Sequence, residues 1–581
     1  MIAILLGWLT FFFVVVSIGN IAVRVFQYLV NAPSSYDIFD FFFIGVCMVG
    51  AIANTWSIFL PTNQYLLLLF ISVSAFYTLS RLAHLKKNFH QLFNDLKGNN
   101  KYIIIFIFFM CIIGSFSLIP PIIYDTYAYH LPSIQWIEKY NVLPGLANVN
   151  TRFGFNSSIL VLSSVFSLDF LFSNQIFVVN SICMLVFILW LAFKSLIKPA
   201  PESLIYILFI YLFIAQYLYF ISSPATDLLP NLLCAFLLLR VLFNSESVQE
   251  STVIYWLIPL FCLTLKLSAF PIVLICLLPF SDLRSILSVK RIIAFCCIGG
   301  IVIIPWLSRN VILTGYLFYP LPAIDLFSFD WKIPIDKVIA EKDAIYSWAR
   351  VPGVDSTRVL TLKFSEWFPG WWSRTSNTQR LVFIINAFSP LVLLLLKIRQ
   401  RPLKLNWILL VVWLVSFIGF TSWLLTAPDW RFSYSFLLIL SVFPIMLFNR
   451  FITSHEKLFK SISYSCLIII SIIFLYAGLI TVHSMVPKTK LLSLLEKPAY
   501  LENGSKIDYT AKKIGFLYWL PSARTDDKFG YNIETIGTTS IYVPKTGNQC
   551  FDKFPCAPCF DEKVKMRGDK IEDGFRYEQM K

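Results

Sequence analysis

The chain has 581 residues, of which 57% are hydrophobic and 14% are charged, whereas roughly 25% of residues are charged in ordinary soluble proteins. This composition excludes an ordinary soluble domain, and a disordered chain would show the opposite balance. The net charge is 48 − 33 = +15, but the basic residues lie in short loops between apolar runs, which indicates membrane orientation and not nucleic-acid binding. The sequence therefore predicts an all-α polytopic membrane protein.

About fourteen apolar stretches reach or approach the length of a membrane span, which is roughly 17 to 25 residues. In chain order they cover 3–23, 38–60, 65–81, 102–119, 174–193, 203–221, 228–243, 253–265, 268–281, 292–308, 381–397, 406–425, 433–449 and 464–484. The first is expected to be a retained span, because it has neither a basic n-region nor a small-residue cleavage site. The pair 253–265 and 268–281 predicts a hairpin of short helices that turns near Lys266 and Ser268.

Lys and Arg residues concentrate in alternate loops, which should therefore face the cytoplasm. Both termini and three longer segments are then expected outside, namely 120–174, 309–380 and a tail over 486–581. The tail is large enough for a small α+β domain. Residues 1–101 would hold extra spans and a cytoplasmic loop, and 102–485 the transmembrane core. Because the cytoplasmic loops are short, an active site is expected on the outer face.

The first outer segment begins with an acid close to the membrane. Asp125 follows the span 102–119, and its neighbours include Tyr129 and His130. Partial desolvation at such a rim would make a carboxylate a better general base, although a water-exposed helix-end acid is an alternative. For His130, an interfacial amphipathic role is favoured over catalysis. A short helix that starts at Pro132 is predicted to lie flat on the bilayer.

Four further charged residues are predicted at the outer rim: Asp227, Lys266, Arg309 and Arg431. Asp227 could be functional or could cap a helix. Lys266 has apolar neighbours on both sides and is placed to meet a lipid phosphate, with snorkelling as the alternative. Arg309 and Arg431 could bind phosphate through a bidentate fork; otherwise Arg309 is a rim cation and Arg431 pairs with Asp429. Three cations converging on one outer cavity would form a site for a pyrophosphate or phosphodiester.

Two other features carry weaker signals. The segment WFPGWW supplies Trp367, Trp371 and Trp372, for which a membrane-interface belt is favoured over sugar stacking. The tail contains three clustered cysteines, Cys550, Cys556 and Cys559. A disulfide is expected outside the cytoplasm; of the three pairings, Cys550 with Cys556 is preferred and the others stay open.

Taken in chain order, these features resemble the GT-C superfamily of membrane glycosyltransferases, which use polyprenyl-phosphate-linked sugars. The resemblance covers about 102–450 plus the tail, whose Gln549-Cys550 and Pro555-Cys556 steps are similar to those of an uncharacterised bacterial branch. It departs from many relatives in having Thr126 where they have a second acid, and in three extra spans before the core. The shared features are an early acid, a second rim acid, a hairpin lysine and an Arg-to-Tyr-Pro stretch: Asp125, Asp227, Lys266 and Arg309–Pro320.

The resemblance implies an inverting transfer from a polyprenyl-phosphate sugar to a glycan, lipid or protein acceptor. The donor phosphate would bind the three cations, which would stabilise it as it departs. Asp125 would take the acceptor proton, and Asp227 would orient the acceptor or bind a divalent cation if one is used. Tyr129 and His130 would contact substrate. The expected location is the cytoplasmic (inner) membrane of a bacterium, with the site facing the periplasm or exterior.

Two other function classes compete with this hypothesis. A polysaccharide polymerase or ligase would act on lipid-diphosphate glycans and would typically need a long basic loop. The 309–380 segment has charges of both signs instead, so this class is the runner-up. A transporter of lipid-linked glycans would place polar residues at mid-bilayer and would show inverted repeats. The sequence shows neither of these transporter features.

Overall fold

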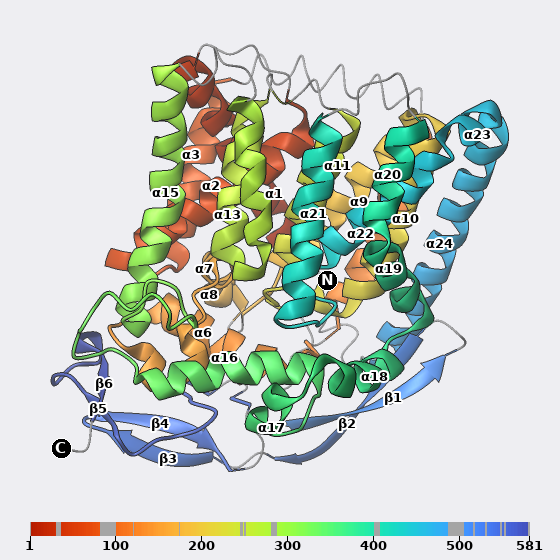
Figure 1. Ribbon diagram of the computed structural model, residues 1–581. Helices are drawn as coiled ribbons and strands as arrows, with labels where there is room; N and C mark the ends of the chain where they lie inside the picture. Colours follow the sequence, from red (N-terminus) through yellow and green to blue (C-terminus); the bar gives the residue numbers. More distant parts are fainter. Residues whose placement is uncertain are drawn as a thin grey trace.

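The computed structural model describes residues 2–30, 36–81, 100–119, 121–172, 175–244, 248, 251–280, 288–399, 407–485, 505–514, 518–528, 531–545, 549–550 and 553–578. Within these ranges, eight helices are long and apolar enough to cross a membrane. They are α1 (Ile2–Val30), α2 (Ile38–Phe59), α5 (Asn100–Ser117), α9 (Val179–Ile197), α10 (Ala200–Tyr217), α15 (Val289–Thr314), α21 (Trp407–Leu425) and α24 (Glu456–Met485). They stand side by side as a bundle (Figure 1). The predicted helical, membrane-spanning architecture is therefore confirmed, whereas the number of about fourteen spans stays a prediction.

Shorter apolar helices complete the bundle. They are α3 (Gln64–Leu79), α11 (Leu228–Phe243), α13 (Thr252–Leu265), η5 (Leu267–Phe280) and α22 (Tyr434–Leu447), together with α19 (Asn377–Ala387) and α20 (Ser389–Arg399), which meet at a bend of 55°. The predicted hairpin is confirmed: α13 and η5 pack together on either side of Lys266, and the indole of Trp256 donates to the carbonyl of Cys276 at 3.1 Å. The second arm is a 3-10 helix that contains Pro271 and Pro279, neither of which has an N–H to donate to a regular α-helix.

Small residues let the first two helices approach closely. A Cβ on Gly45 of α2 would overlap the carbonyl of Val15 on α1, and one on Gly19 of α1 would overlap the carbonyl of Phe41 on α2. Packing of this kind holds helices together in a bilayer, where lipid tails are as apolar as the side chains. The first two helices are therefore closely packed parts of the bundle, and Ser57 of α2 accepts a hydrogen bond from Arg309 of α15.

One end of the bundle carries the non-membrane segments, and we call it the strand-bearing end. The π-helix η1 (Thr126–His130), α6 (Leu131–Lys139), α7 (Ser158–Val165) and α8 (Asp169–Phe172) lie there. The helices α16 (Ile335–Arg350), α17 (Ser356–Thr361) and α18 (Phe364–Arg374) lie beside them, with α16 running across the end (Figure 1). The structure contradicts the expectation that α6 lies flat on the surface of the bilayer. Nearly all of α6 is buried, because Leu131 and Ile134 pack into the core of the bundle and the tail covers Trp136 through Phe554 at 4.9 Å.

The described part of the tail consists of three antiparallel strand pairs: β1 (Ser505–Ile514) with β2 (Tyr518–Lys528), β3 (Tyr531–Ile536) with β4 (Thr539–Pro544), and β5 (Val564–Met566) with β6 (Phe575–Tyr577). In 505–578 the only described helical turn is the short 3-10 segment η9 (Ile571–Asp573), so the described part of the tail is built mainly of strands and the expected α+β composition of the whole tail stays a prediction. Ile541 and Phe575 share one buried apolar cluster with Trp136 and Leu313. The tail therefore packs directly against the loops at the strand-bearing end.

Candidate functional site

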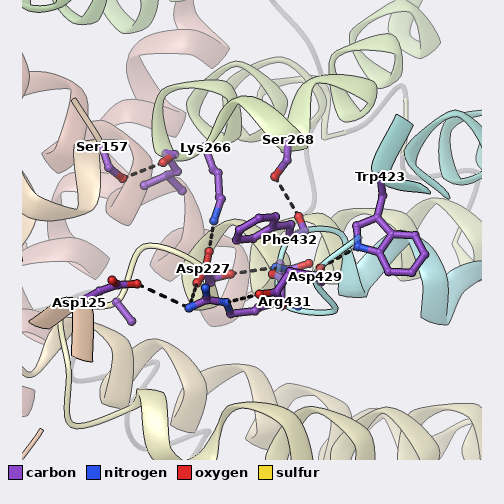
Figure 2. A network of polar contacts seen from close by, with 12 residues as sticks. Asp125, Ser157, Asp227, Lys266, Ser268, Trp423, Asp429, Arg431 and Phe432 are labelled. Atoms are coloured by element: carbon purple, nitrogen blue, oxygen red, sulfur yellow. Dashed lines mark hydrogen bonds and ion pairs between the residues drawn. The ribbon is translucent and has the colours of Figure 1, made fainter. Parts of the chain in front are cut away.

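Three of the predicted charged residues lie at helix ends. Asp227 directly precedes α11, Lys266 directly follows α13, and Arg431 lies shortly before α22. Asp125 directly precedes η1. Helix ends at one side of a bundle bring such residues together even though they are far apart in sequence. Figure 2 shows the four side chains pointing toward one another, and we call them the charged cluster.

Arg431 is the centre of the charged cluster. Its Nη1 lies 3.6 Å from an oxygen of Asp125 and 3.6 Å from an oxygen of Asp227, and its Nε donates to Asp429 at 3.0 Å. The local pair with Asp429 that the sequence suggested is thus present beside the longer contacts. Burial alone would lower the pKa of Arg431, but the charges of Asp227, Asp429 and Asp125 outweigh this effect and hold that pKa above its ordinary value.

Lys266 forms an ion pair with the buried carboxylate of Asp227, and its Nζ lies 3.8 Å from the centre of the Phe432 ring. Burial alone would raise the pKa of Asp227, but the charges of Lys266 and Arg431 outweigh it and hold that pKa below the ordinary value. Asp227 therefore stays ionised at neutral pH and serves as counterion to two cations. It is a poor acceptor for a proton.

The loop that carries Arg431 is fixed by hydrogen bonds to its backbone. The indole of Trp423 donates to the carbonyl of Asp429 at 2.7 Å, and the hydroxyl of Ser268 donates to the carbonyl of Phe432 at 2.9 Å (Figure 2). Ser268 begins the second arm of the hairpin whose turn holds Lys266. The two cations of the site are thus connected through a short polar path, and this kind of support keeps functional groups in place.

Asp125 differs from Asp227 in being accessible. Its side chain is 25% exposed, and its second cationic neighbour is Arg152, whose Nη1 lies 3.6 Å away. Arg152 in turn lies 3.6 Å from Glu341 of α16. No recognisable motif predicts Arg152 or Glu341 as site residues, since both lie in long outer segments. The only signal for Arg152 is a basic residue in the same outer loop as the candidate acid.

His130 and Tyr129 lie next to the cluster and are buried. Burial lowers the pKa of His130 to about 4, so its ring is neutral at pH 7. Neither ring nitrogen has a hydrogen-bond partner within the described residues. The ring meets Tyr129 edge-on at 4.3 Å, and the guanidinium of Arg152 lies 5.5 Å from the Tyr129 ring centre. The favoured interfacial role of His130 is therefore corrected, because an interfacial side chain would be partly exposed.

Arg309 is placed apart from the contacts of the charged cluster. It lies buried on α15, where its Nε donates to Asn156 at 2.9 Å and its Nη1 donates to Ser57 at 2.5 Å. Among the described residues it has no ion pair with an acid. The side chain points into the bundle, between α2 and the start of α7, so the rim position expected from the sequence does not hold and only two of the three expected cations meet.

The expectation of a membrane-interface belt is corrected for two of the three tryptophans of α18. Trp367 and Trp371 are buried, which excludes them from an exposed membrane-interface belt. The Trp371 ring stacks on Trp430 with centres 6.0 Å apart, and its indole donates to the carbonyl of Pro428 at 2.8 Å. Trp371 therefore supports the loop that presents Arg431.

The tail cysteines include one disulfide, and the described residues contain no cluster of metal ligands. Cys550 and Cys556 form the disulfide, which is the preferred pairing, and Cys559 is a free, exposed thiol. Across the ranges that the structure describes, no group of three or more His, Cys, Asp or Glu side chains could hold a metal ion. Asp125 and Asp227 instead share the guanidinium of Arg431, so the divalent cation considered above gains no ligand set here.

The arrangement combines three chemical capacities. Lys266 and Arg431 can hold an anion through charge-assisted hydrogen bonds. Asp125 is an accessible carboxylate that can take a proton beside that anion. Fixed cations stabilise negative charge that develops on a leaving group, because they need no reorganisation during the reaction.

Comparison with known proteins adds a family but no activity. No curated protein and no solved structure matches the chain. The sequence model of one family matches residues 1–438, which include the whole charged cluster but not the tail. The chain therefore belongs to the family described as "Domain of unknown function (DUF8201)".

Proposed function

We propose that this protein transfers a sugar from a polyprenyl-phosphate donor to a hydroxyl acceptor at its strand-bearing end. The observation that carries the proposal is the meeting of two accessible cations and one accessible carboxylate at the ends of apolar helices. The side chains of Lys266 and Arg431 are 22% and 24% exposed, and Asp125 is within ion-pair distance of Arg431. An anion that approaches these cations stands beside a base.

The donor phosphate is proposed to bind Lys266 and Arg431. Both cations are held by Asp227 before the donor arrives, so the phosphate oxygens compete with this buried carboxylate for the same N–H groups. Asp227 thereby keeps the cations close together and limits the binding of anions that form weaker contacts. This division of roles follows from the lowered pKa of Asp227, which makes it a counterion, whereas Asp125 remains available as the base.

The proposed reaction is a single displacement at the anomeric carbon. The acceptor oxygen forms a bond to that carbon while its proton moves to the Asp125 carboxylate. The bond from the anomeric carbon to the phosphate oxygen breaks, and polyprenyl phosphate leaves with the electron pair. Lys266 and Arg431 stabilise the charge on the leaving phosphate, and the configuration at the anomeric carbon inverts.

An apolar groove beside α18 supports a lipid-linked donor. The groove has a volume of about 430 Å³ and is lined by side chains that include Phe368, Trp372, Phe383 and Phe388. It lies between α18 and α19. The neighbouring residue on α18, Trp371, contacts the loop that carries Arg431. A polyprenyl chain in this groove would therefore lie on the same supporting helix as the loop that binds its phosphate.

A polysaccharide polymerase or ligase that uses lipid diphosphates remains the second candidate, and one experiment separates the two. Lipid extracts from a strain lacking the protein are analysed by mass spectrometry, together with its surface glycans. The proposal expects a polyprenyl monophosphate that carries one sugar to accumulate, and the same sugar to disappear from the glycans. Asp125→Asn should reproduce this loss, whereas the ion-paired control Asp325→Asn should restore the glycan. Accumulation of lipid-diphosphate oligosaccharides would contradict the proposal and favour the polymerase or ligase.

A further inference from the structure

The tail contacts the chain on both sides of Asp125. The backbone N–H of Cys550 donates to the carbonyl of Tyr127 at 2.8 Å. The side-chain amide of Gln549 donates to the carbonyl of Tyr124 at 3.2 Å. We call Gln549 and Cys550 the clasp. Although they lie more than four hundred residues away in sequence, they bracket the candidate base.

The clasp supplies a hydrogen bond that the local helix cannot. In the π-helix η1, the N–H of Leu131 donates to the carbonyl of Thr126, five residues earlier. The next donor in that register would be Pro132, which has no N–H. Cys550 donates to the corresponding carbonyl, that of Tyr127, from outside the helix. The backbone geometry after Asp125 therefore depends on a residue of the tail.

The clasp is itself held in place by the tail. Cys550 is fully buried and forms the disulfide with Cys556. The segment around Cys556 lies alongside β4: the N–H of Tyr542 donates to the carbonyl of Pro555 at 2.9 Å, and the N–H of Ala557 donates to the carbonyl of Tyr542 at 3.0 Å. The disulfide thus joins the donor that faces η1 to a paired strand.

We infer that the tail is a positioning element of the candidate site, in which the disulfide-tethered clasp holds the segment that carries Asp125. The clasp residues hydrogen-bond to the backbone of Tyr124 and Tyr127, so they are positioning residues and act through Asp125. The consequence for catalysis rests on the proposed function, whereas the mechanical link between clasp and η1 does not. This inference also assigns a role to a region that lies beyond the matched family segment, 1–438.

The mechanical link is tested by amide hydrogen exchange in the full-length protein in lipid nanodiscs. The double variant Cys550→Ser with Cys556→Ser should increase exchange in peptides over 126–131 at least tenfold, while peptides over 40–55 of α2 stay unchanged. Cys559→Ser, which removes a thiol outside the disulfide, is the matched control. If the double variant does not fold, reduction of the folded wild-type protein, followed by reoxidation, replaces it. Unchanged exchange over 126–131 after loss of the disulfide would overturn the inference.

The catalytic consequence is tested by steady-state kinetics with the donor identified from the lipid extracts. Loss of the disulfide should lower kcat at least tenfold and leave the donor KM within twofold, because the phosphate-binding cations are not touched. Gln549→Ala should cause a smaller change in the same direction. Two results would overturn the inference: a kcat of the double variant equal to that of wild type, or a rise in donor KM that accounts for the whole loss of kcat/KM. Increased exchange over 126–131 in a protein that transfers no sugar would contradict the proposed function and would still support the mechanical link.

Discussion

Replacing Asp125 by Asn should separate catalysis from stability, because the surrounding cations do not depend on this carboxylate alone. Arg431 keeps Asp227, and Arg152 keeps Glu341, when Asp125 loses its charge. The lost contacts are 3.6 Å ion pairs of a partly exposed side chain, and such pairs contribute about 0 to 1 kcal/mol each. The unfolding free energy should therefore fall by about 1 to 2 kcal/mol at most.

The effect of the same substitution on the reaction should be much larger. Removal of a general base lowers rates by about 10² to 10⁴, which corresponds to about 3 to 5 kcal/mol in activation free energy. Asp227→Asn should instead affect mainly stability, since it removes the buried carboxylate paired with Lys266 and one of the three carboxylates around Arg431, and it should cost up to about 3 to 5 kcal/mol. Substitution of Asp125 is thus predicted to lower mainly the rate of transfer, whereas substitution of Asp227 is predicted to lower mainly the stability.

The assay measures release of polyprenyl phosphate by purified protein in nanodiscs, together with the thermal midpoint of each variant. Asp325→Asn is the control, because Asp325 is paired with Lys332 and lies outside the charged cluster. Transfer within threefold of wild type by folded Asp125→Asn would refute the assignment of the base. A midpoint for Asp125→Asn as low as that of Asp227→Asn would refute the division of roles.

Three further predictions concern Lys266, Arg309 and His130. Lys266→Ala should weaken binding of a polyprenyl phosphate about 10- to 100-fold, as expected for one charge-assisted hydrogen bond, whereas Lys332→Ala, which removes another ion-paired lysine above an aromatic ring, should not. Arg309→Lys should lower the thermal midpoint without a selective loss of phosphate binding, because a lysine cannot span Asn156 and Ser57. The free energy of unfolding of the wild-type protein should fall by about 2 kcal/mol between pH 7 and pH 5 because of His130, and His130→Gln should remove this contribution.

The sign of the His130 effect follows from its lowered pKa of about 4. Between the ordinary value of about 6.5 and this value, the unfolded chain binds more protons than the folded one, so stability falls as the pH drops through that window. Equal pH dependence of the midpoint in wild type and His130→Gln would contradict this reasoning. For the other two predictions, the contradictory results are equal affinity losses in Lys266→Ala and Lys332→Ala, and a selective loss of phosphate affinity in Arg309→Lys.

The sequence contains enough information to identify much of the charged cluster. Asp227 and Lys266 each lie next to an apolar stretch at the side that the basic loops leave outside, and the length and charge of those stretches locate the helix ends. What sequence cannot supply is convergence, because four segments bring these residues together. Arg309 illustrates the limit: its position along α15 was predictable, but the direction of its side chain depends on Ser57 of α2 and on Asn156, which are far away in sequence.

The tail shows a second limit. Its cysteines indicated a disulfide, yet nothing in their spacing indicates that Cys550 donates to the backbone of Tyr127. The burial of α6 was missed for the same reason, since its pattern of apolar residues is compatible with a bilayer surface as well as with a covering of strands. Contacts between segments hundreds of residues apart decide both features, and single-sequence patterns do not report them.

The central claim is that Lys266 and Arg431 receive a lipid phosphate beside Asp125. Cryo-electron microscopy of the full-length protein in nanodiscs that contain a polyprenyl phosphate tests it most directly. We predict phosphate density within hydrogen-bonding distance of Lys266 Nζ and the Arg431 guanidinium, with the chain in the groove beside Trp372. Phosphate density elsewhere, with Lys266 and Arg431 still held by Asp227, would contradict the claim.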